Sequence, residues 1–285
     1  MEINTRVGVE GHSSSNTVKK RIPIKVKEGN VNGLRELVKK MTTTQKDAFR
    51  KEYGNLLNLL EIEVQTPAII ALAQYYDPPL RCFTFQDFQL VPTVEEFEQI
   101  LDLPLEGKTP YNYLGRYTPI LTLAEIMKIH PVKLEKKVTV KGKVMGLPKG
   151  YLEWYLYQLM KKERWTTFMD VLALVLYGVM LFPNVENFVD YAAINAFVAY
   201  KTQSENPVVA VLAEVYGTFD QCYELKRKKM LCCLPVLYVW FVSRVSKGTL
   251  NAICPVEELL HCKPKLREPQ EWVQLCADLN EEKVN

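Results

Sequence analysis

The most uniformly hydrophobic stretch of the chain is Trp165–Phe182, in which Asp170 is followed by twelve consecutive apolar or glycine positions. A helix that is apolar on every side has to be surrounded by protein or by lipid. Twelve residues span only about 18 Å at 1.5 Å per residue, whereas a bilayer requires roughly 20 apolar residues. The pattern therefore predicts a central core helix. Thr167 and Asp170 have capping-box spacing at its start, and Pro183 ends it.

Amphipathic patterns on both sides of this segment predict further helices. One follows Thr93 and Glu96, which again have capping-box spacing, and it ends before Pro104. Apolar residues at positions i, i+3, i+4 and i+7 predict another over 185–200. Thr44, Thr122 and Thr218 are expected N-caps, Gly54 and Gly217 are expected stops, and a kink is expected at Pro235. Further helices are predicted over 34–41, 44–54, 66–76, 122–130, 152–164, 207–217, 218–242 and 272–279.

β-forming residues gather in one short stretch. Residues 81–85 alternate like a strand, Gln86 and Asp87 can turn, and 88–91 can return. The sequence thus predicts a mainly α, helical bundle-like globular domain with a small β-hairpin near residues 80–92. We expect a disordered basic arm over 1–30, a single domain over 31–280 with a Lys-rich linker at 126–150, and a frayed end at 281–285.

Charge is distributed unevenly along the chain, although its net value is only +3. Residues 1–60 carry twelve Lys and Arg against six Asp and Glu, and 126–150 carry seven Lys against Glu135 alone, so each stretch has a net charge of +6. Basic patches of this kind attract nucleic acid or anionic surfaces. The ordinary alternative is a solvated loop.

Seven cysteines, an odd number, and a polar, basic stretch after Met1 predict free thiols and no secretory signal. We therefore expect an intracellular protein of the nucleus or cytoplasm, with no membrane partner.

Each candidate for catalysis or cofactor binding has a simpler explanation. Gly107-Lys108-Thr109 resembles the end of a phosphate-binding loop but lacks its first glycine, and Pro110 obstructs the helix that such a loop needs. A zinc site would have to use Cys254, His261, Cys262 and Cys276, which lack the close C-x-x-C pairs of structural zinc sites. His12, His130 and His261 lie in no recognisable catalytic context. No catalytic residue, cofactor or metal is expected.

The candidate binding residues are basic and lie near aromatic residues. The lysines that could contact nucleic-acid phosphates are Lys133, Lys136, Lys137, Lys141 and Lys143. The neighbouring aromatic residues that could stack on bases are Trp154, Tyr155, Tyr157 and Trp165. At helical spacing such rings are more often core residues. Lys226-Arg227-Lys228-Lys229 could be a nuclear-localisation patch or a solvated helix face.

Three segments, taken in order, resemble the plant mobile domain family, specifically its transposon-associated branch of unknown function. They are Asp77–Phe97, Leu172–Asp190 and Cys232–Phe241. The resemblance implies a mainly helical domain of mobile elements or of proteins domesticated from them, with nuclear roles in silencing or genome maintenance for some members. The label "aminotransferase-like" given to such domains supplies no catalytic residue here. Because family members usually continue beyond Lys283-Val284-Asn285, a C-terminally truncated product is expected.

The leading hypothesis from the sequence is a non-catalytic, transposable-element-derived domain that acts as a protein-interaction module with an unknown partner. Its basis is the abundance of apolar faces beside a lack of polar constellations. The alternatives are a nucleic-acid-binding component of a mobile element and an uncharacterised enzyme.

Overall fold

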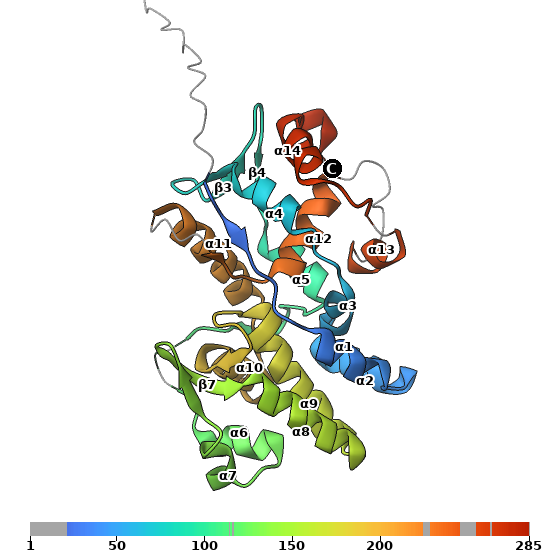
Figure 1. Cartoon of the computed structure of the whole chain (residues 1–285), viewed down its shortest axis with the longest axis vertical. Coiled ribbons are helices and arrows are strands. Elements are labelled where there is room, and N and C mark those ends of the chain that lie inside the picture. Colours follow the sequence, from blue (N-terminus) through green and yellow to red (C-terminus); the bar gives the residue numbers. More distant parts are fainter. Residues whose placement is uncertain are drawn as a thin grey trace, which may run out of the picture.

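The computed structural model describes residues 22–113, 115, 117–224, 229–245, 255–262 and 264–284. Within these residues the chain forms fourteen α-helices and a few small sheets, which confirms the mainly α fold. The molecule is elongated, and Figure 1 shows two groups of elements stacked along its long axis. One continuous set of buried apolar side chains extends through both groups.

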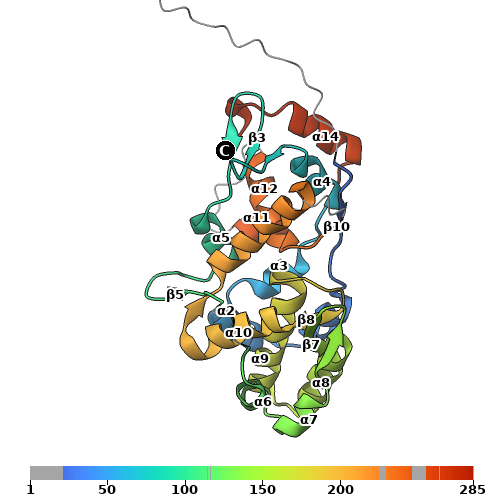
Figure 2. The same cartoon turned by 90° about the vertical axis from the view of Figure 1, so that its left-hand side faces the viewer.

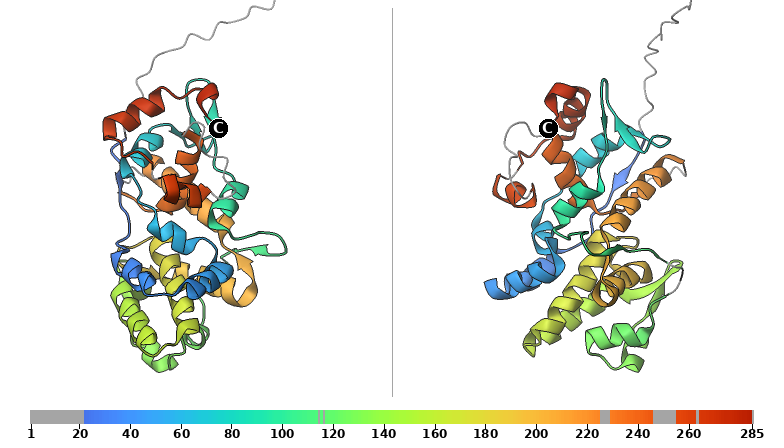
Figure 3. Two further views of the ribbon diagram at one scale, coloured as in Figure 1. Left: turned by 90° about the vertical axis from the view of Figure 1, so that its right-hand side faces the viewer. Right: turned by 180° about the vertical axis from the view of Figure 1, so that it is seen from behind.

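One group contains most of the middle of the chain. Its helices are α1 (Asn32–Lys39), α2 (Thr43–Tyr53), α6 (Ile120–Met127), α7 (Pro131–Glu135), α8 (Lys149–Lys161), α9 (Trp165–Leu176) and α10 (Tyr191–Gln203). A π-helix, Tyr177–Leu181, continues α9. The antiparallel sheet β6-β7-β8 consists of β6 (Thr139–Lys141), β7 (Val144–Pro148) and β8 (Phe188–Asp190). Figure 3 shows α6 and α7 at one end of the molecule.

The other group lies around α12 (Leu234–Val245), which is buried along most of its length. The remaining helices are α3 (Leu56–Glu61), α4 (Thr66–Ala73), α5 (Val94–Leu101), α11 (Val208–Glu224), α13 (Pro255–Cys262) and α14 (Pro269–Ala277). The antiparallel strands are β2 (Tyr76–Asp77), β3 (Cys82–Thr84) and β4 (Gln89–Leu90). The predicted hairpin near residues 80–92 is therefore confirmed.

Two short parallel pairings join distant parts of the chain. β1 (Lys25–Val26) pairs with β10 (Lys229–Met230), and β5 (Thr109–Pro110) pairs with β9 (Glu205–Asn206). Figure 2 shows the dark-blue chain that contains β1 running along one edge of the molecule past β10. Residues 22–30 are thus held in place, contrary to the expected disordered arm. Residues 1–21 of that arm lie outside the described residues, as do 226–228 of the proposed localisation patch.

The core helix is confirmed in place and character. Every residue of Val171–Leu181 is buried, and the helical run ends at Leu181, one residue before the predicted end at Phe182. Gly178 is required here because a Cβ at this position would lie 2.6 Å from Val189 Cγ1 of β8. The absence of a side chain lets the sheet pack directly on the π-helix.

The start of the core helix differs from the prediction. The helix begins at Trp165, so Thr167 is buried inside it and does not cap it. Asp170 instead accepts a hydrogen bond of 2.5 Å from the Tyr53 hydroxyl of α2. A similar error concerns Thr122, because α6 begins at Ile120 after Pro119. Thr and Asp at the right spacing serve tertiary contacts as readily as caps.

Other helix boundaries were predicted with mixed success. The Thr93–Glu96 capping box is present, and Gly54 ends α2, but Thr42 and not Thr44 caps that helix. The helix expected from residue 185 begins at Tyr191, where Asp190 caps it by accepting from Ala193 N at 3.0 Å. α11 continues through Gly217, so the stop at Gly217 and the cap at Thr218 were wrong. Pro235 lies in the first turn of α12 and not at a kink within the helix.

The stretch 126–150 is not a linker. It contains the last turn of α6, all of α7, the β6-β7 hairpin and the start of α8. Gly142 has φ +65° in the hairpin turn, and Leu134 and Leu147 are buried in the core. At the other end of the domain, Glu281–Lys283 form a 3-10 turn within the predicted frayed end. The Lys-rich stretch 126–150 thus consists of helices and strands joined by short turns, and its lysines are held in defined positions by these elements.

Candidate nucleic-acid interface

The corner between α6 and α7 orients a group of lysines outward. Lys128 ends α6 in the left-handed conformation, and Pro131 begins α7, so the chain turns sharply between them. Leu134 is the only buried residue of α7 and anchors it on α6. Lys133, Lys136 and Lys137 are exposed around this anchor. A short helix with one buried residue, together with the turn after it, thus presents three exposed lysines.

α8 supplies the facing wall. Its buried leucines, Leu152, Leu156 and Leu159, belong to the core, and α8 packs against α9. The adjacent stripe follows the i, i+3, i+4, i+7 rule and consists of Tyr151, Trp154, Tyr155 and Gln158. The Tyr155 hydroxyl donates a hydrogen bond of 2.7 Å to Met127 O, which ties α8 to the end of α6.

Between these walls lies a groove of about 500 Å³, which we call the α7–α8 groove. Its lining includes Lys128, Lys133, Lys136, Lys137, Lys162 and Arg164, together with His130, and it includes no Asp or Glu. Across the described part of the chain, the ion pairs use none of these six cations. The groove therefore has a formal charge of +6 that the protein itself does not pair, and it attracts anions.

The floor of the groove is aromatic. The Tyr151 and Trp154 ring centroids are 6.0 Å apart with planes 25° from parallel, and Tyr151 and Tyr155 are 6.4 Å apart and 11° from parallel. Lys137 Nζ lies 5.5 Å from the Tyr151 ring centroid, a cation–π distance. Burial raises the pKa of both tyrosines, so their hydroxyls are neutral near pH 7. The floor is therefore aromatic, uncharged and bordered by cations.

The predicted contact residues divide into two groups. Lys133, Lys136 and Lys137 line the groove. Lys141 and Lys143 lie outside its lining, on and beside the β6-β7 hairpin, where Lys141 Nζ donates to Glu186 O at 2.6 Å. The five lysines thus do not form one patch, because the first three lie on α7 and the turn after it, whereas the later two lie on the β6-β7 hairpin.

Three of the groove cations were not among the lysines predicted from the sequence to contact nucleic acid. Lys128, Lys162 and Arg164 enter from the ends of α6 and α8. Continuing the aromatic stripe of α8 by i+7 and i+11 from Tyr151 reaches Gln158 and Lys162, so the helical period could have identified part of this wall. The approach of α7 to α8 depends on tertiary packing, which no local pattern encodes.

The aromatic candidates also divide. Trp154 is 56% exposed, so for this residue the core explanation is wrong. Tyr155 is half-buried in the groove, whereas Tyr157 lies outside the lining and has Lys161 Nζ 4.5 Å from its ring centroid. Trp165 is half-buried against Phe168, as a core residue would be.

The other candidates are not assembled into sites. Cys232, Cys233 and Cys276 are buried free thiols, while His12, Cys254 and the side chain of Cys262 lie outside the described residues. In the portions of the chain that the structure describes, no three His, Cys, Asp or Glu side chains are grouped so as to hold a metal ion.

The stretch that resembles a phosphate loop is followed by β5 and not by a helix. Lys108 Nζ lies 5.1 Å from the Tyr200 ring centroid. This geometry does not match a phosphate-binding loop, in which the glycine-rich turn leads directly into a helix.

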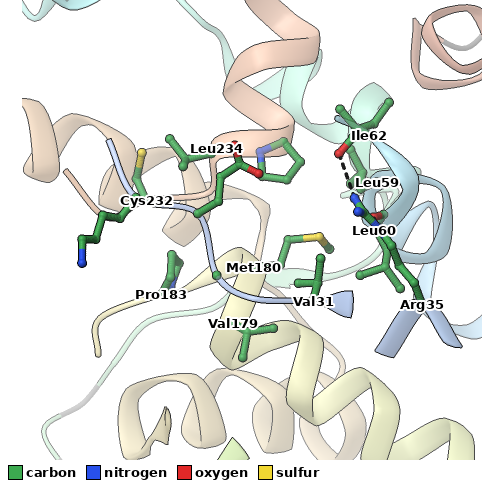
Figure 4. Close-up of a pocket in the computed structure, with 14 residues that line it drawn as sticks. Val31, Arg35, Leu59, Leu60, Ile62, Val179, Met180, Pro183, Cys232 and Leu234 are labelled. Atoms are coloured by element: carbon green, nitrogen blue, oxygen red, sulfur yellow. Dashed lines mark hydrogen bonds between the residues drawn. The ribbon is translucent and has the colours of Figure 1, made fainter. Parts of the chain in front are cut away.

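A second cavity lies where the N-terminal segment crosses the two groups of elements. Val31, Leu60, Met180 and Leu234 are among its apolar lining residues, and Figure 4 shows Arg35 at its edge. The Arg35 guanidinium donates to Leu60 O at 2.8 Å and to Ile62 O at 3.3 Å. This cavity has a volume of about 30 Å³, which holds about one or two water molecules and is too small for a substrate.

No helix among the described residues combines the length and the apolar character that crossing a membrane requires. In comparisons with known proteins, the model of a family described as a domain of unknown function (DUF7745) matches residues 34–285. No curated protein and no solved structure gives a significant match.

Proposed function

Because this chain belongs to the DUF7745 family, whose function is unknown, its role has to be argued from its own surface, and we propose that it binds nucleic acid through the α7–α8 groove. The observation that carries the proposal is the groove's six cations without a lining carboxylate. Proteins bind the phosphate backbone with such clusters, because each neutralised phosphate releases condensed counterions.

The aromatic floor distinguishes this patch from an ordinary solvated lysine surface. A basic helix face on water is bordered by polar residues, whereas here Tyr151, Trp154 and Tyr155 lie between the cations. Aromatic rings among Lys and Arg are typical of surfaces that hold both the bases and the backbone of nucleic acid. The proposed role is binding, without a catalytic step.

The protein-interaction module favoured by the sequence has weaker support. Its basis was the abundance of apolar faces, and the large apolar residues of α9, α10 and α12 lie in the common core. Large exposed apolar side chains are found elsewhere, as at Leu80, Leu121 and Leu266. Single exposed residues of this kind are normal on soluble proteins and do not define a contact surface.

The resemblance to transposon-associated plant mobile domains stays a prediction, and it supports a mobile-element origin, in which nucleic-acid binding has an obvious place. An intracellular location is part of the proposal. Its support is that Cys82, Cys232, Cys233 and Cys276 are free thiols, as expected in a reducing compartment.

The direct test is a salt titration of binding by the whole chain to a fluorescently labelled oligonucleotide. Each phosphate contact contributes about −0.7 to the slope of log affinity against log salt for a single strand. Reversing two groove charges in Lys133→Glu/Lys136→Glu should weaken binding at least tenfold and reduce the slope by about 1.4. The matched control, Lys46→Glu/Lys51→Glu on α2, makes the same charge change away from the groove and should have a much smaller effect. Absence of binding at about 50 mM salt, or equal losses in both double variants, would refute the proposal.

A further inference from the structure

Trp154 is the most exposed aromatic residue of α8. It is 56% exposed, although α8 buries its leucines against α9 and half-buries Tyr151 and Tyr155. Trp is usually highly buried, because its ring carries a large apolar surface. The ring lies on the lining of the groove and not on an isolated convex surface. Its exposed face is therefore available to a planar ligand held by the surrounding cations.

The neighbouring rings are less available than Trp154. Lys137 Nζ lies over the Tyr151 ring, and the Tyr155 hydroxyl is fixed to Met127 O. The Tyr151 and Trp154 rings are stacked with nearly parallel planes. A flat group placed on Trp154 would thus continue a stack that the protein has already begun.

We infer that the ligand of the α7–α8 groove is a single-stranded nucleic acid, one base of which stacks on Trp154 while its phosphates lie along Lys133 of α7 and along Lys136 and Lys137 just after it. This inference rests on the proposed function and specifies its ligand. In a duplex, both faces of each base are covered by neighbouring base pairs, so an indole in a groove cannot reach them. An unpaired strand offers the faces of its bases, and stacking on aromatic side chains is tolerant of sequence.

The arrangement of charges agrees with a strand that crosses the groove. Lys133, Lys136 and Lys137 lie on the α7 side, and Lys162 and Arg164 lie beyond the C-terminal end of α8. Cations on both sides of an aromatic floor can follow the backbone past a stacked base. A phosphate-only ligand would use the cations and leave the indole uncovered.

The test compares a labelled single-stranded 12-mer, the matched duplex and inorganic polyphosphate on the whole chain. Trp154→Ala should weaken single-strand binding about 5- to 150-fold, the range of one lost base stack. Trp154→Phe should recover most of the affinity, because it keeps an aromatic face. The matched control is Tyr157→Ala, an exposed ring on the same helix outside the groove, and it should change affinity less than about twofold. Duplex and polyphosphate should bind more weakly, with affinities that Trp154→Ala leaves unchanged.

Two outcomes would overturn the inference and leave the proposed function standing. One is equal or tighter binding of the duplex, and the other is unchanged single-strand affinity in Trp154→Ala while Lys133→Glu/Lys136→Glu still loses binding. A third outcome, in which no nucleic acid binds, would remove both proposals. Circular dichroism of each variant checks that α8 is intact, and quenching of tryptophan fluorescence that disappears in Trp154→Phe reports directly on the stacked ring.

Discussion

The indole Nε1 of Trp240 donates a hydrogen bond of 3.1 Å to Glu96 Oε2. The same carboxylate accepts from Thr93 N at 2.8 Å, which completes the capping box of α5, and it forms an ion pair with Arg244. Trp240 and Arg244 both belong to α12. One carboxylate thus closes the start of α5 and fixes that end against the most buried helix of its group.

Replacing Glu96 by alanine should destabilise the domain by about 2–4 kcal/mol. The substitution removes the hydrogen bond that Glu96 accepts from Thr93 N, which is worth about 1 kcal/mol, and leaves a buried indole N–H without its acceptor, which costs about 1–3 kcal/mol. Urea unfolding followed by fluorescence measures the change. Glu95→Ala, on the exposed side of the same first turn, is the control and should leave the midpoint nearly unchanged. Equal midpoints for the two variants would contradict the assigned role of Glu96.

This residue also shows what the sequence could reveal. The Thr93–Glu96 spacing predicted the cap because capping is local and depends on four consecutive residues. The contact with Trp240, 144 positions away, depends on how α5 packs on α12 and has no local signature. Thr167 and Asp170 have the same kind of spacing, yet Asp170 is used by Tyr53. Spacing alone does not distinguish a cap from a tertiary contact.

The candidate site was predictable to a similar extent. Charge counting identified Lys133, Lys136 and Lys137 because they are clustered in sequence. It placed Lys141 in the same patch, although the β6-β7 hairpin directs it toward Glu186. This hairpin was not predicted from the sequence because the lysine-rich stretch has only a weak strand pattern of its own. The sheet is completed by β8, which comes from residues 188–190, far along the chain.

Two glycine substitutions should have opposite effects on stability. Gly146 lies in β7, and a Cβ there would be 2.2 Å from Val189 O and 2.7 Å from Asp190 Cα. Since both neighbours are backbone atoms, Gly146→Ala has to separate β7 from β8, and we expect a loss of about 1–3 kcal/mol or more. Gly217 lies within α11 with nothing within 4 Å of the added Cβ, so Gly217→Ala should stabilise by about 0.5–1 kcal/mol.

Differential scanning calorimetry of the two variants provides the measurement, and each variant serves as the control for the other. A higher melting temperature for Gly146→Ala would show that the two strands can separate without cost. A lower one for Gly217→Ala would show that α11 ends at Gly217, as the sequence suggested.

Acid should loosen the N-terminal segment through Glu186. Hydrogen bonds with Lys229 of β10 and Lys27 beside β1 lower the pKa of Glu186 from 4.5 to about 2. A carboxylate with a lowered pKa stabilises the folded state above its unfolded pKa, and this contribution is lost as the pH falls from about 4.5 to about 2.

The expected result is that wild type exceeds Glu186→Gln in urea midpoint at pH 6, and that the difference disappears as the pH approaches 2. A difference that is constant over this range would show that the charge of Glu186 plays no part. The Lys27→Gln variant should reproduce part of the loss, because one of the two lysine partners remains.

Five cysteines should resist alkylation in the folded protein. Cys82, Cys222, Cys232, Cys233 and Cys276 are all buried, and burial raises the pKa of Cys233 and of Cys276 to about 12. Because the thiolate is the nucleophile, a thiol with this pKa is ionised in only about one molecule in 10⁴ at pH 8, and burial also excludes the reagent. Iodoacetamide at pH 8 should therefore leave these five unmodified under native conditions and modify all of them in guanidinium chloride, as peptide mass spectrometry can show. Modification of Cys232 or Cys233 in the native protein at the rate seen in denaturant would mean that the start of α12 opens readily, which the buried core around it does not allow.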